Sequence, residues 1–339
     1  MEKKLDIIGI EDLLMDFPVQ IDRIPETDGG TRMHDYVWQS GGNASSAIVA
    51  AARLGGKCAM VGSVGNDPFG DFCRHDMEMH GVDISHIKIL EGETTFVMCL
   101  AEKETQGRSF IGYSGVHKDL TPEEIDEEFI KSAKAVHANL SNRFNIVTAF
   151  DFARKNDVLV SVDAAFAFPG CEEAAKHVDL LVMSEYFYKA LFGEDDTNYE
   201  ENCKKYLDYG CKAVVVTLGG KGCAGADAAG TFRLPAHKGK MWDGRDCEII
   251  DTTGAGDVFH GAFTYAWLYR YQKAPYNYTL KDVCRFASTV SYIDCLTLGG
   301  RTGIPTLDMV DHFLETNVVL PGDIKERHDY YHTAMFKKG

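Results

Sequence analysis

Four nearly continuous apolar runs lie in the middle of this 339-residue chain, at residues 135–140, 158–163, 180–183 and 213–218. Helix-forming segments separate each run from the next. Strands that are apolar on both sides are buried on both sides, and strands joined by helices lie parallel within one sheet. The pattern therefore predicts an α/β fold, with a mostly parallel central sheet covered by helices on both faces.

Local signals predict the remaining elements. We expect strands at residues 5–10 and 31–39, a hairpin at 93–101 and 108–113, an alanine-rich helix at 43–54, a helix start at 121–124, and helices at 280–293 and 307–314. Apolar spacing, helix-ending glycines and polar turn residues carry these predictions. The tail from Pro321 onward receives no assignment.

Polar side chains stand where the predicted parallel strands end. Asp163, Ser184 and Thr217 each follow an apolar run, whereas His137 lies inside one. Ligands of parallel α/β sheets bind at the carboxyl ends of the strands. We therefore expect the functional site at this edge, and we interpret His137 as a core histidine.

Residues 251–263 form a glycine turn that leads into a helix, Asp-Thr-Thr-Gly-Ala-Gly-Asp-Val-Phe-His-Gly-Ala-Phe. The amides of Gly254, Ala255 and Gly256, with the positive end of the helix dipole, predict an anion site. Asp257 follows at once, and a carboxylate is a poor neighbour for a phosphate. Its position favours a catalytic base that takes a proton from a hydroxyl attacking a phosphoryl group.

A purely structural role for Asp257 is the alternative, because an acid in the first turn also stabilises the helix dipole. Two other phosphate motifs do not fit the chain. Phe259 occupies the place of the third glycine of a dinucleotide fingerprint, and the Gly-Gly-Lys-Cys at residues 55–58 lacks the hydroxyl of a P-loop.

The net charge of −16, from 35 basic and 51 acidic side chains, argues against nucleic acid and anionic membranes as partners. No apolar run is long enough to span a membrane, and the short N-terminal apolar run is interrupted by Asp12, which argues against a secretion signal. The ten cysteines include no Cys-x-x-Cys pair. They are interpreted as reduced thiols of a cytoplasmic protein.

The string at residues 251–257 resembles the Asp-Thr-x-Gly-Ala-Gly-Asp signature of the ribokinase-like (PfkB-type) carbohydrate kinase family. Residues 41–55 resemble that family's Gly-Gly-Asn signature, and residues 61–70 its Val-Gly-x-Val-Gly-x-Asp segment. The resemblance covers about residues 5–310. It implies one ribokinase-like domain over residues 1–339, with a small β-sheet lid formed by segments near 14–40 and 93–115, and phosphoryl transfer from MgATP to a sugar hydroxyl.

On the acceptor side, the resemblance implies that Asp16 holds two sugar hydroxyls, with Asp12 as a competitor for that place. Gly42 would expose backbone to the sugar, and Asn43 would exchange hydrogen bonds with its hydroxyls. The second asparagine of the family signature is Ser46 here. Arg108 faces either the substrate or solvent, and these contacts together favour a neutral or mono-acidic monosaccharide in furanose form.

On the nucleotide side, the resemblance assigns Thr217, Gly219 and Gly222 to a loop that approaches the nucleotide. The family's Asn-x-x-Glu station for Mg²⁺ reads Ser184-Glu185-Tyr186-Phe187 here. Ser184 therefore stands at the nucleotide, and Glu185 is the nearest acid for the magnesium shell. The backbone of Asp251 and Thr253, with the loop at 298–303, corresponds to a monovalent-cation site that can hold K⁺.

The reading favoured by these features is an ATP-dependent sugar kinase. A nucleoside kinase of the same superfamily is a second hypothesis, because ribose and free sugars use the same carboxylate contacts. A non-catalytic sugar or nucleotide sensor is a third, favoured by the altered Ser184–Phe187 station. A homodimer through the lid is also expected, since short lid strands alone would leave an exposed edge and an apolar face.

Overall fold

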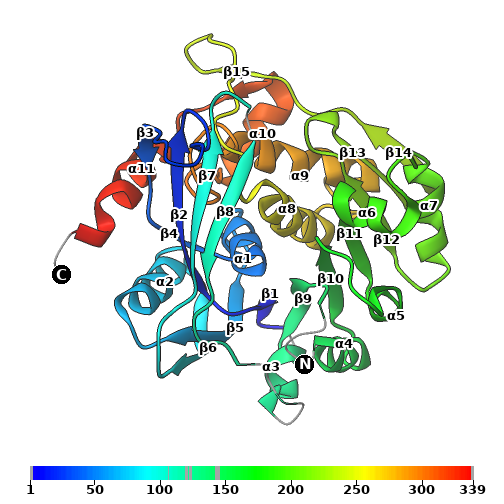
Figure 1. Cartoon of the computed structure of the whole chain (residues 1–339). Coiled ribbons are helices and arrows are strands. Elements are labelled where there is room, and N and C mark those ends of the chain that lie inside the picture. The colour runs from blue at the N-terminus through cyan, green and yellow to red at the C-terminus, as the bar shows by residue number, and fades with distance from the viewer. Residues whose placement is uncertain (1–2, 106, 119–120, 122–123, 142–145, 337–339) are drawn as a thin grey trace.

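The computed structural model describes residues 3–105, 107–118, 121, 124–141 and 146–336. Its main body is a nine-stranded sheet between helices, and a smaller sheet stands on one side of that body (Figure 1). Within the described residues, no helix combines the length and apolar character needed to cross a membrane. All ten cysteines are free thiols, and nine of them are buried.

The central sheet has the order β14-β13-β12-β11-β10-β9-β1-β5-β6. Its strands are β1 (Leu5–Ile10), β5 (Cys58–Gly65), β6 (Asp83–Leu90), β9 (Ala133–Asn139), β10 (Leu159–Ala164), β11 (Leu180–Ser184), β12 (Ala213–Thr217), β13 (Cys223–Asp227) and β14 (Gly230–Leu234). Every pair from β6 to β12 is parallel, and β13 and β14 add an antiparallel edge. The predicted mostly parallel sheet is therefore confirmed.

Successive residues of the buried strands face opposite layers of helices. In β11, Leu180 and Val182 join one core, and Leu181 and Met183 join the other. The first core includes α1 (Asn43–Arg53), α2 (Pro68–Met79), α8 (Ala255–Tyr269), α9 (Leu280–Asp294) and α10 (Leu307–Thr316). The second includes α3 (Glu127–Lys131), α4 (Ile146–Lys155), α5 (Cys171–Ala175), α6 (Glu185–Phe192) and α7 (Tyr199–Leu207). This alternation explains why the strands lack a polar side, and it confirms helices on both faces.

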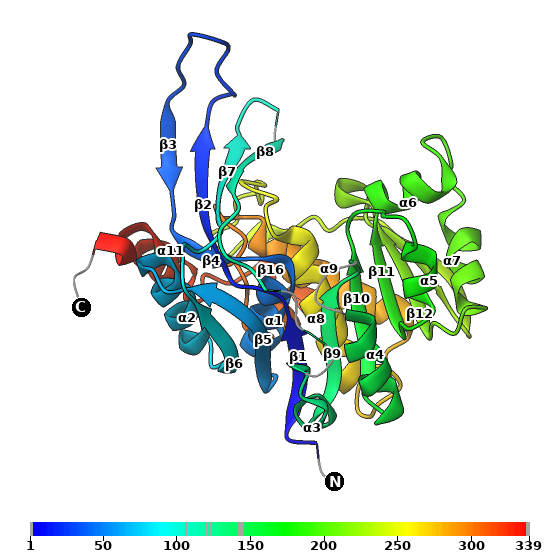
Figure 2. The ribbon, with the colours of Figure 1, turned by 60° about the horizontal axis from the view of Figure 1, so that its bottom comes forward.

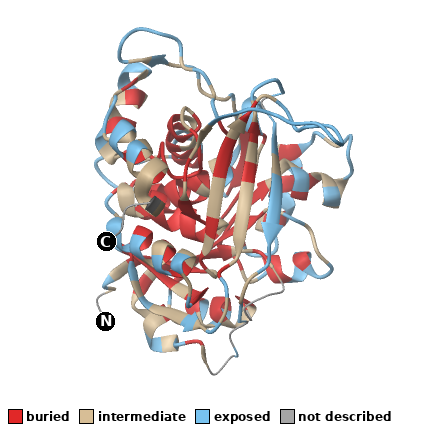
Figure 3. Ribbon diagram, turned by 60° about the vertical axis from the view of Figure 1, so that its left-hand side comes forward, coloured by how far each residue is buried: buried red, intermediate tan, exposed pale blue. Residues whose placement is uncertain are grey.

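The smaller sheet consists of β2 (Leu14–Ile21), β3 (Met33–Tyr36), β4 (Gln39–Gly41), β7 (Phe96–Glu102) and β8 (Arg108–Tyr113). Figure 2 shows it projecting from the α/β body. Its outer strands are less buried than the central sheet (Figure 3), and β8 is almost wholly exposed. Both segments expected for the lid contribute strands, and a lid function stays a proposal.

Three sequence-based boundaries differ from the structure. The strand expected at 31–39 is split into β3 and β4, because Pro18 of β2, which lies opposite Val37, has no N–H to donate to the ladder. The Trp38 amide between the two strands donates to the Tyr331 carbonyl at 2.9 Å. The helix start expected at 121–124 falls partly on residues 122–123, outside the described residues, and α3 begins later, at Glu127. The tail without an assignment forms helix α11 (Ile324–Thr333), beside α2 and β3 in Figure 1. The short pair β15 (Lys240–Met241) and β16 (Val318–Val319) completes the fold.

Helices α1 and α8 pack unusually close together. A Cβ built at Gly261 of α8 would lie 1.9 Å from the carbonyl oxygen of Ala47 in α1. Only a glycine permits this approach of two backbones. The alanine-rich sequence of α1 keeps its surface small along the rest of the contact. As a result, the N-terminal ends of both helices reach the same edge of the sheet.

The close helix contact predicts a sharp difference between two glycines of one helix. Gly261→Ala should lower the free energy of unfolding by about 1–3 kcal/mol, the usual cost of overpacking. Gly256→Ala is the matched control, since a Cβ there meets no atom within 4 Å and the chain loses only backbone freedom. Urea denaturation measures both variants. Equal changes at the two positions would contradict the proposed contact.

Candidate active site

The direction in which strands are added reverses between β1 and β9. From β1 the sheet grows through β5 and β6 on one side, and through β9 to β14 on the other. Ligands of open α/β sheets bind at such a reversal, outside the carboxyl ends of the strands. A cavity of about 260 Å³ opens there, lined by Ile10, Glu11, Asp12, Leu13, Leu14, Thr95, Ser114, His117, Asn139 and Ser141.

Helix α8 begins beside this edge with a glycine in a left-handed conformation. Gly254 has φ 74°, and a Cβ there would lie 2.6 Å from the Cα of Gly300. Both facts require glycine. Gly256 is exposed, and as the second helical residue it has no carbonyl partner within the helix for its N–H. The amide of Ala255 donates to the Thr252 carbonyl at 3.2 Å, so this turn is partly closed on itself.

Asp257 lies in the first turn of α8 and is half-buried. Burial raises the pKa of its carboxyl well above the usual value, and the negative charges of Asp163, Glu11 and Asp16 raise it further. The positive charge of Arg108 lowers this pKa and only partly offsets the other effects. Asp16 and Arg108, predicted from distant parts of the sequence, therefore lie near enough to Asp257 for their charges to affect the pKa of its carboxyl.

Arg108 reaches from the small sheet to the turn before α8. Its Nη1 donates a hydrogen bond to the Thr252 hydroxyl at 2.7 Å. Asp16 lies on β2, where burial raises the pKa of its carboxyl to about 7 although the charge of Arg301 lowers it. The carboxylate lies against the backbone of Gly41, since a Cβ there would be 2.1 Å from the Asp16 Oδ2. The competitor Asp12 instead accepts a hydrogen bond from the Ser63 amide at 2.8 Å.

The start of α1 contacts Glu11, which lines the cavity. Gly42 has φ 99° and precedes the helix, and a Cβ there would lie 2.7 Å from the Glu11 Oε2. The Ser45 amide donates to the same oxygen at 3.2 Å. Burial raises the pKa of Glu11 to about 7, although the amides at the start of α1 lower it. The Asn43 side chain donates to the Asp163 Oδ2 at 3.5 Å.

Asp163, which accepts from Asn43, also contacts a buried histidine. The Nε2 of His260 is 3.1 Å from the Oδ1 of Asp163, and both side chains are almost fully buried. Burial by itself would raise the pKa of Asp163, but the charge and hydrogen bond of His260 lower it. His260 lies one turn after Asp257 on α8, and Asp163 lies on β10. The contact between His260 and Asp163 therefore links the helix that carries Asp257 to β10. His137 is also buried, and burial lowers its pKa to about 3, as fits a neutral core histidine.

The predicted nucleotide residues lie farther along the same edge, at the ends of β11 and β12. The Ser184 hydroxyl caps α6 by accepting from the Phe187 amide at 2.9 Å, and it donates to the Ala165 carbonyl at 2.8 Å. Phe187 is buried in the core. The Thr217 hydroxyl donates to the Met183 carbonyl at 3.3 Å.

The neighbouring glycine loop contacts the start of α6. Gly219 and Gly222 have φ 55° and 98°. Lys221, between them, donates to the Oε1 of Glu185 at 2.9 Å, and the Tyr199 hydroxyl donates to the same oxygen at 2.9 Å. Among the described residues, no three His, Cys, Asp or Glu side chains are grouped to hold a metal ion.

Asp251 joins the two segments of the predicted cation site. Its Oδ1 accepts from the Thr253 amide at 2.8 Å and its Oδ2 from the Gly299 amide at 2.9 Å. In the part of the chain that the structure describes, the buried hydroxyls of Thr253 and Thr302 have no hydrogen-bond partner. Buried polar atoms normally have a hydrogen-bond partner. Two hydroxyl oxygens without one, on the two segments joined by Asp251, are consistent with ligands for a small cation.

Several polar residues of the site were missed in the sequence. Glu11 directly follows an apolar strand and Asn139 ends another, so their positions at strand ends could have revealed them. The Asn139 side chain donates to the Glu11 Oε1 at 3.0 Å. His260 and Arg301 gave no signal, because their partners Asp163 and Asp76 are far away in the sequence.

Comparisons with known proteins show the family to which the chain belongs. The sequence profile of the pfkB family carbohydrate kinases matches residues 7–307. The ATP-dependent ribose-1-phosphate kinase of Halopiger xanaduensis is 30% identical, over 88% of this chain and 94% of its own length. A ribokinase of Arabidopsis thaliana, solved with ribose and ATP, has a TM-score of 0.72 at 19% identity, over 93% of this chain and 99% of its own.

A further solved structure, from Escherichia coli and in complex with ATP and Mg²⁺, has a TM-score of 0.73 at 21% identity. It covers 92% of this chain and 99% of its own. These solved structures share the overall fold of this chain, and the match of the family profile extends over most of the chain. The chain therefore belongs to the pfkB family of carbohydrate kinases, as a kinase of sugars or nucleosides.

Proposed function

We propose that this protein is an ATP-dependent sugar kinase in which Asp257 is the general base. The observation that carries the proposal is the placement of Asp257. It lies one residue after an exposed glycine at a helix N-terminus, and burial, together with the neighbouring acids, raises its pKa. A base works best when its pKa lies near the working pH, so a raised carboxyl pKa suits proton uptake from a sugar hydroxyl.

The transferring phosphoryl group would lie at the turn formed by Gly254, Ala255 and Gly256. The chain's own packing requires glycine at 254 but not at 256, where an added Cβ meets nothing within 4 Å. Close approach of a ligand to the amides is the remaining reason for a glycine there. Amides and the helix dipole would stabilise negative charge as the phosphoryl group moves in line toward the acceptor.

The acceptor would lie between the small sheet and α1, held by Asp16, Gly42 and Asn43. The acids around this wall favour hydroxyls, which donate hydrogen bonds, over anionic groups. A neutral monosaccharide, in furanose form, is therefore the favoured substrate. Arg108, the cation that affects Asp257, leaves a place for one acidic group on the sugar.

The nucleotide would extend along the ends of β11 and β12, with Thr217, Gly219 and Gly222 near its base and sugar and Ser184 beside its phosphates. Mg²⁺ would neutralise charge on the phosphates, and because it binds mainly phosphate oxygens and water it needs few protein ligands. Glu185 is the acid available to its outer shell, provided that the ion pair with Lys221 opens. A K⁺ ion held by Asp251, Thr253 and the loop at 298–303 would stabilise the adjacent turn formed by Gly254, Ala255 and Gly256.

Two other functions remain to be separated from this one. A nucleoside kinase would use the same carboxylates on ribose, and the cavity beside Glu11 and Asn139 offers acceptors and donors for a base. A non-catalytic sensor would need no base, so the presence of Asp257 after the glycine turn weighs against it.

A panel of acceptors tests the proposed function. We expect ADP release from MgATP to require a monosaccharide, with one phosphorylated sugar formed for each ADP. Hexoses, pentoses and nucleosides are compared by coupled assay and by mass spectrometry of the products. Turnover with nucleosides alone would select the nucleoside kinase, and binding without turnover of any acceptor would select the sensor.

The same panel, repeated with different salts, tests the cation site. Initial rates should be modestly higher in potassium than in sodium or tetramethylammonium buffers. A bound cation would order the two segments that Asp251 joins. It would thereby also order the adjacent turn formed by Gly254, Ala255 and Gly256. Identical rates in all three salts would remove the proposed K⁺ site.

We also propose a homodimer through the small sheet. Ile111 and Tyr113 share one face of β8 and are 60% and 53% exposed, and a second copy would cover this face. Light scattering at micromolar concentration should give about twice the mass of the 37.6-kDa chain. Ile111→Lys should restore the single-chain mass, because burying a lysine there is costly. A monomeric parent protein would contradict the proposal.

A further inference from the structure

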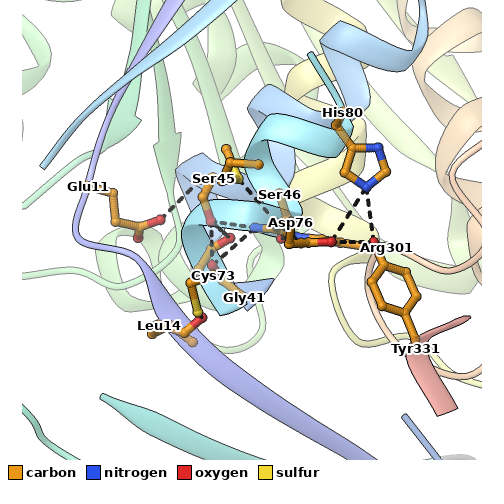
Figure 4. Close-up of polar contacts among 12 residues, drawn as sticks. Glu11, Leu14, Gly41, Ser45, Ser46, Cys73, Asp76, His80, Arg301 and Tyr331 are labelled. Atoms are coloured by element: carbon orange, nitrogen blue, oxygen red, sulfur yellow. Dashed lines mark hydrogen bonds and ion pairs between the residues drawn. The ribbon is translucent and has the colours of Figure 1, made fainter. Parts of the chain in front are cut away.

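Helix α11 lies beyond residue 307, where the match to the family profile ends. Its buried side chains are Arg327 and Tyr331. Tyr331 belongs to a buried polar network that reaches the start of α1, and Figure 4 shows this network. The network joins α11, α2, the loop after α9 and the turn that holds Gly42.

The centre of the network is a fully buried ion pair. The Nη1 of Arg301 lies 2.8 Å from the Oδ2 of Asp76, and neither side chain is exposed. The Nη2 of Arg301 donates to the Gly41 carbonyl at 3.1 Å and to the Ser45 hydroxyl at 2.6 Å. Gly41 directly precedes the proposed sugar contacts, so Arg301 fixes the backbone on which they stand.

The Ser45 contact carries the network to the cavity, because the Ser45 amide donates to Glu11. Ser46, which replaces an asparagine of the family signature, is also part of the network. Its hydroxyl accepts from the Arg301 Nε at 3.3 Å and is buried. The residue that differs from the signature therefore pairs with the buried arginine.

Tyr331 donates a hydrogen bond to the second carboxylate oxygen of Asp76. Its hydroxyl donates to the Asp76 Oδ1 at 2.8 Å and lies 3.0 Å from the His80 Nε2. One carboxylate oxygen thus faces Arg301 and the other faces Tyr331. Buried ion pairs hold a fixed geometry only when their remaining hydrogen-bonding atoms are satisfied. The Tyr331 hydroxyl therefore restrains Asp76, and through it Arg301.

Helix α11 also holds the strands that lead into the turn. The Tyr331 carbonyl accepts from the Trp38 amide, between β3 and β4. His328 pairs with Asp35 at 2.8 Å, and the His332 ring bonds the Tyr36 carbonyl at 2.8 Å. The chain from Asp35 to Gly41 is consequently fixed by α11 near its start and by Arg301 at its end.

We propose that Tyr331 is a positioning residue for the sugar acceptor. Acting through Asp76 and Arg301, it holds the turn from Gly41 to Asn43 in the conformation that binds the sugar. The inference rests on the proposed function, which places the acceptor at this turn. Gly41 also supports Asp16, since the two are in direct contact. The C-terminal helix therefore controls both proposed acceptor contacts without touching the substrate.

Hydrogen exchange of the ligand-free protein tests the coupling without any activity. Tyr331→Phe removes the hydroxyl that binds Asp76. Tyr330→Phe is the matched control, since it removes the hydroxyl of the preceding residue on the same helix. Amides at residues 39–46 should exchange roughly three- to tenfold faster in Tyr331→Phe, as expected for the loss of one buried hydrogen bond. Exchange equal to that of the control would overturn the inference.

A second variant separates this coupling from a general loss of stability. Asp35→Asn weakens the contacts of the Asp35 carboxylate with His328, at 2.8 Å, and with His332, at 3.6 Å, and leaves the buried network intact. Exchange at residues 33–38 should rise in this variant, with the same melting temperature as the parent. An effect spread evenly over the whole chain in both variants would show that α11 contributes only stability.

Kinetics distinguish a positioning role from a catalytic one. Tyr331→Phe should raise the KM for the sugar roughly three- to tenfold, while kcat and the KM for ATP stay within about twofold. An unchanged sugar KM in an active enzyme would overturn the inference and leave the proposed function standing. Absence of sugar turnover in the parent protein would instead reject the proposed function, and the exchange experiment would still decide the coupling.

Discussion

The site depends on the close contact between α1 and α8. At Gly261 and Ala47 the two backbones approach too closely for any side chain at 261. This contact brings two helix N-termini to the carboxyl edge of one sheet, one carrying Asn43 and the other Asp257. Helix N-termini present free amides and a positive dipole end, so their convergence creates a place for polar and anionic ligands. The cavity at the strand reversal between β1 and β9 lies at the same edge of the sheet.

The electrostatics of this place are dominated by acids. Glu11, Asp16 and Asp257 all have raised pKa values, with burial as the largest cause. Desolvation of carboxylates is costly, and proteins keep such groups mainly where they do chemistry or bind ligands. A rigid scaffold is needed to hold these groups together, and the buried Arg301–Asp76 pair supplies part of it. The proposed roles of Asp257 and Tyr331 therefore belong to one arrangement, in which a group of buried acids is supported by buried partners.

The sequence predicted the fold well because its signals are local. Continuous apolar runs marked β9 to β12, and the glycines at 254 and 256 marked the start of α8. The split between β3 and β4 was not predicted, since it depends on which residues pair across the small sheet and on Pro18 lying opposite Val37. Asp163 was predicted from its position at a strand end, whereas the pairs Asp163–His260 and Asp76–Arg301 join residues far apart in the sequence and were not predicted. Ser184 was predicted at the nucleotide, and its capping of α6 became visible only when the helix start was known.

The central claim is that Asp257 accepts a proton during phosphoryl transfer, and the Asp257→Asn enzyme tests it most directly. Asparagine keeps the size and hydrogen bonding of the side chain but cannot act as a base. Steady-state kinetics should show kcat lower by roughly 10²–10⁴-fold, the usual contribution of a positioned base. ATP affinity should be almost unchanged, because backbone amides hold the phosphates, and a thermal melt should show an intact fold. Parental kcat in a correctly folded Asp257→Asn protein would contradict the account.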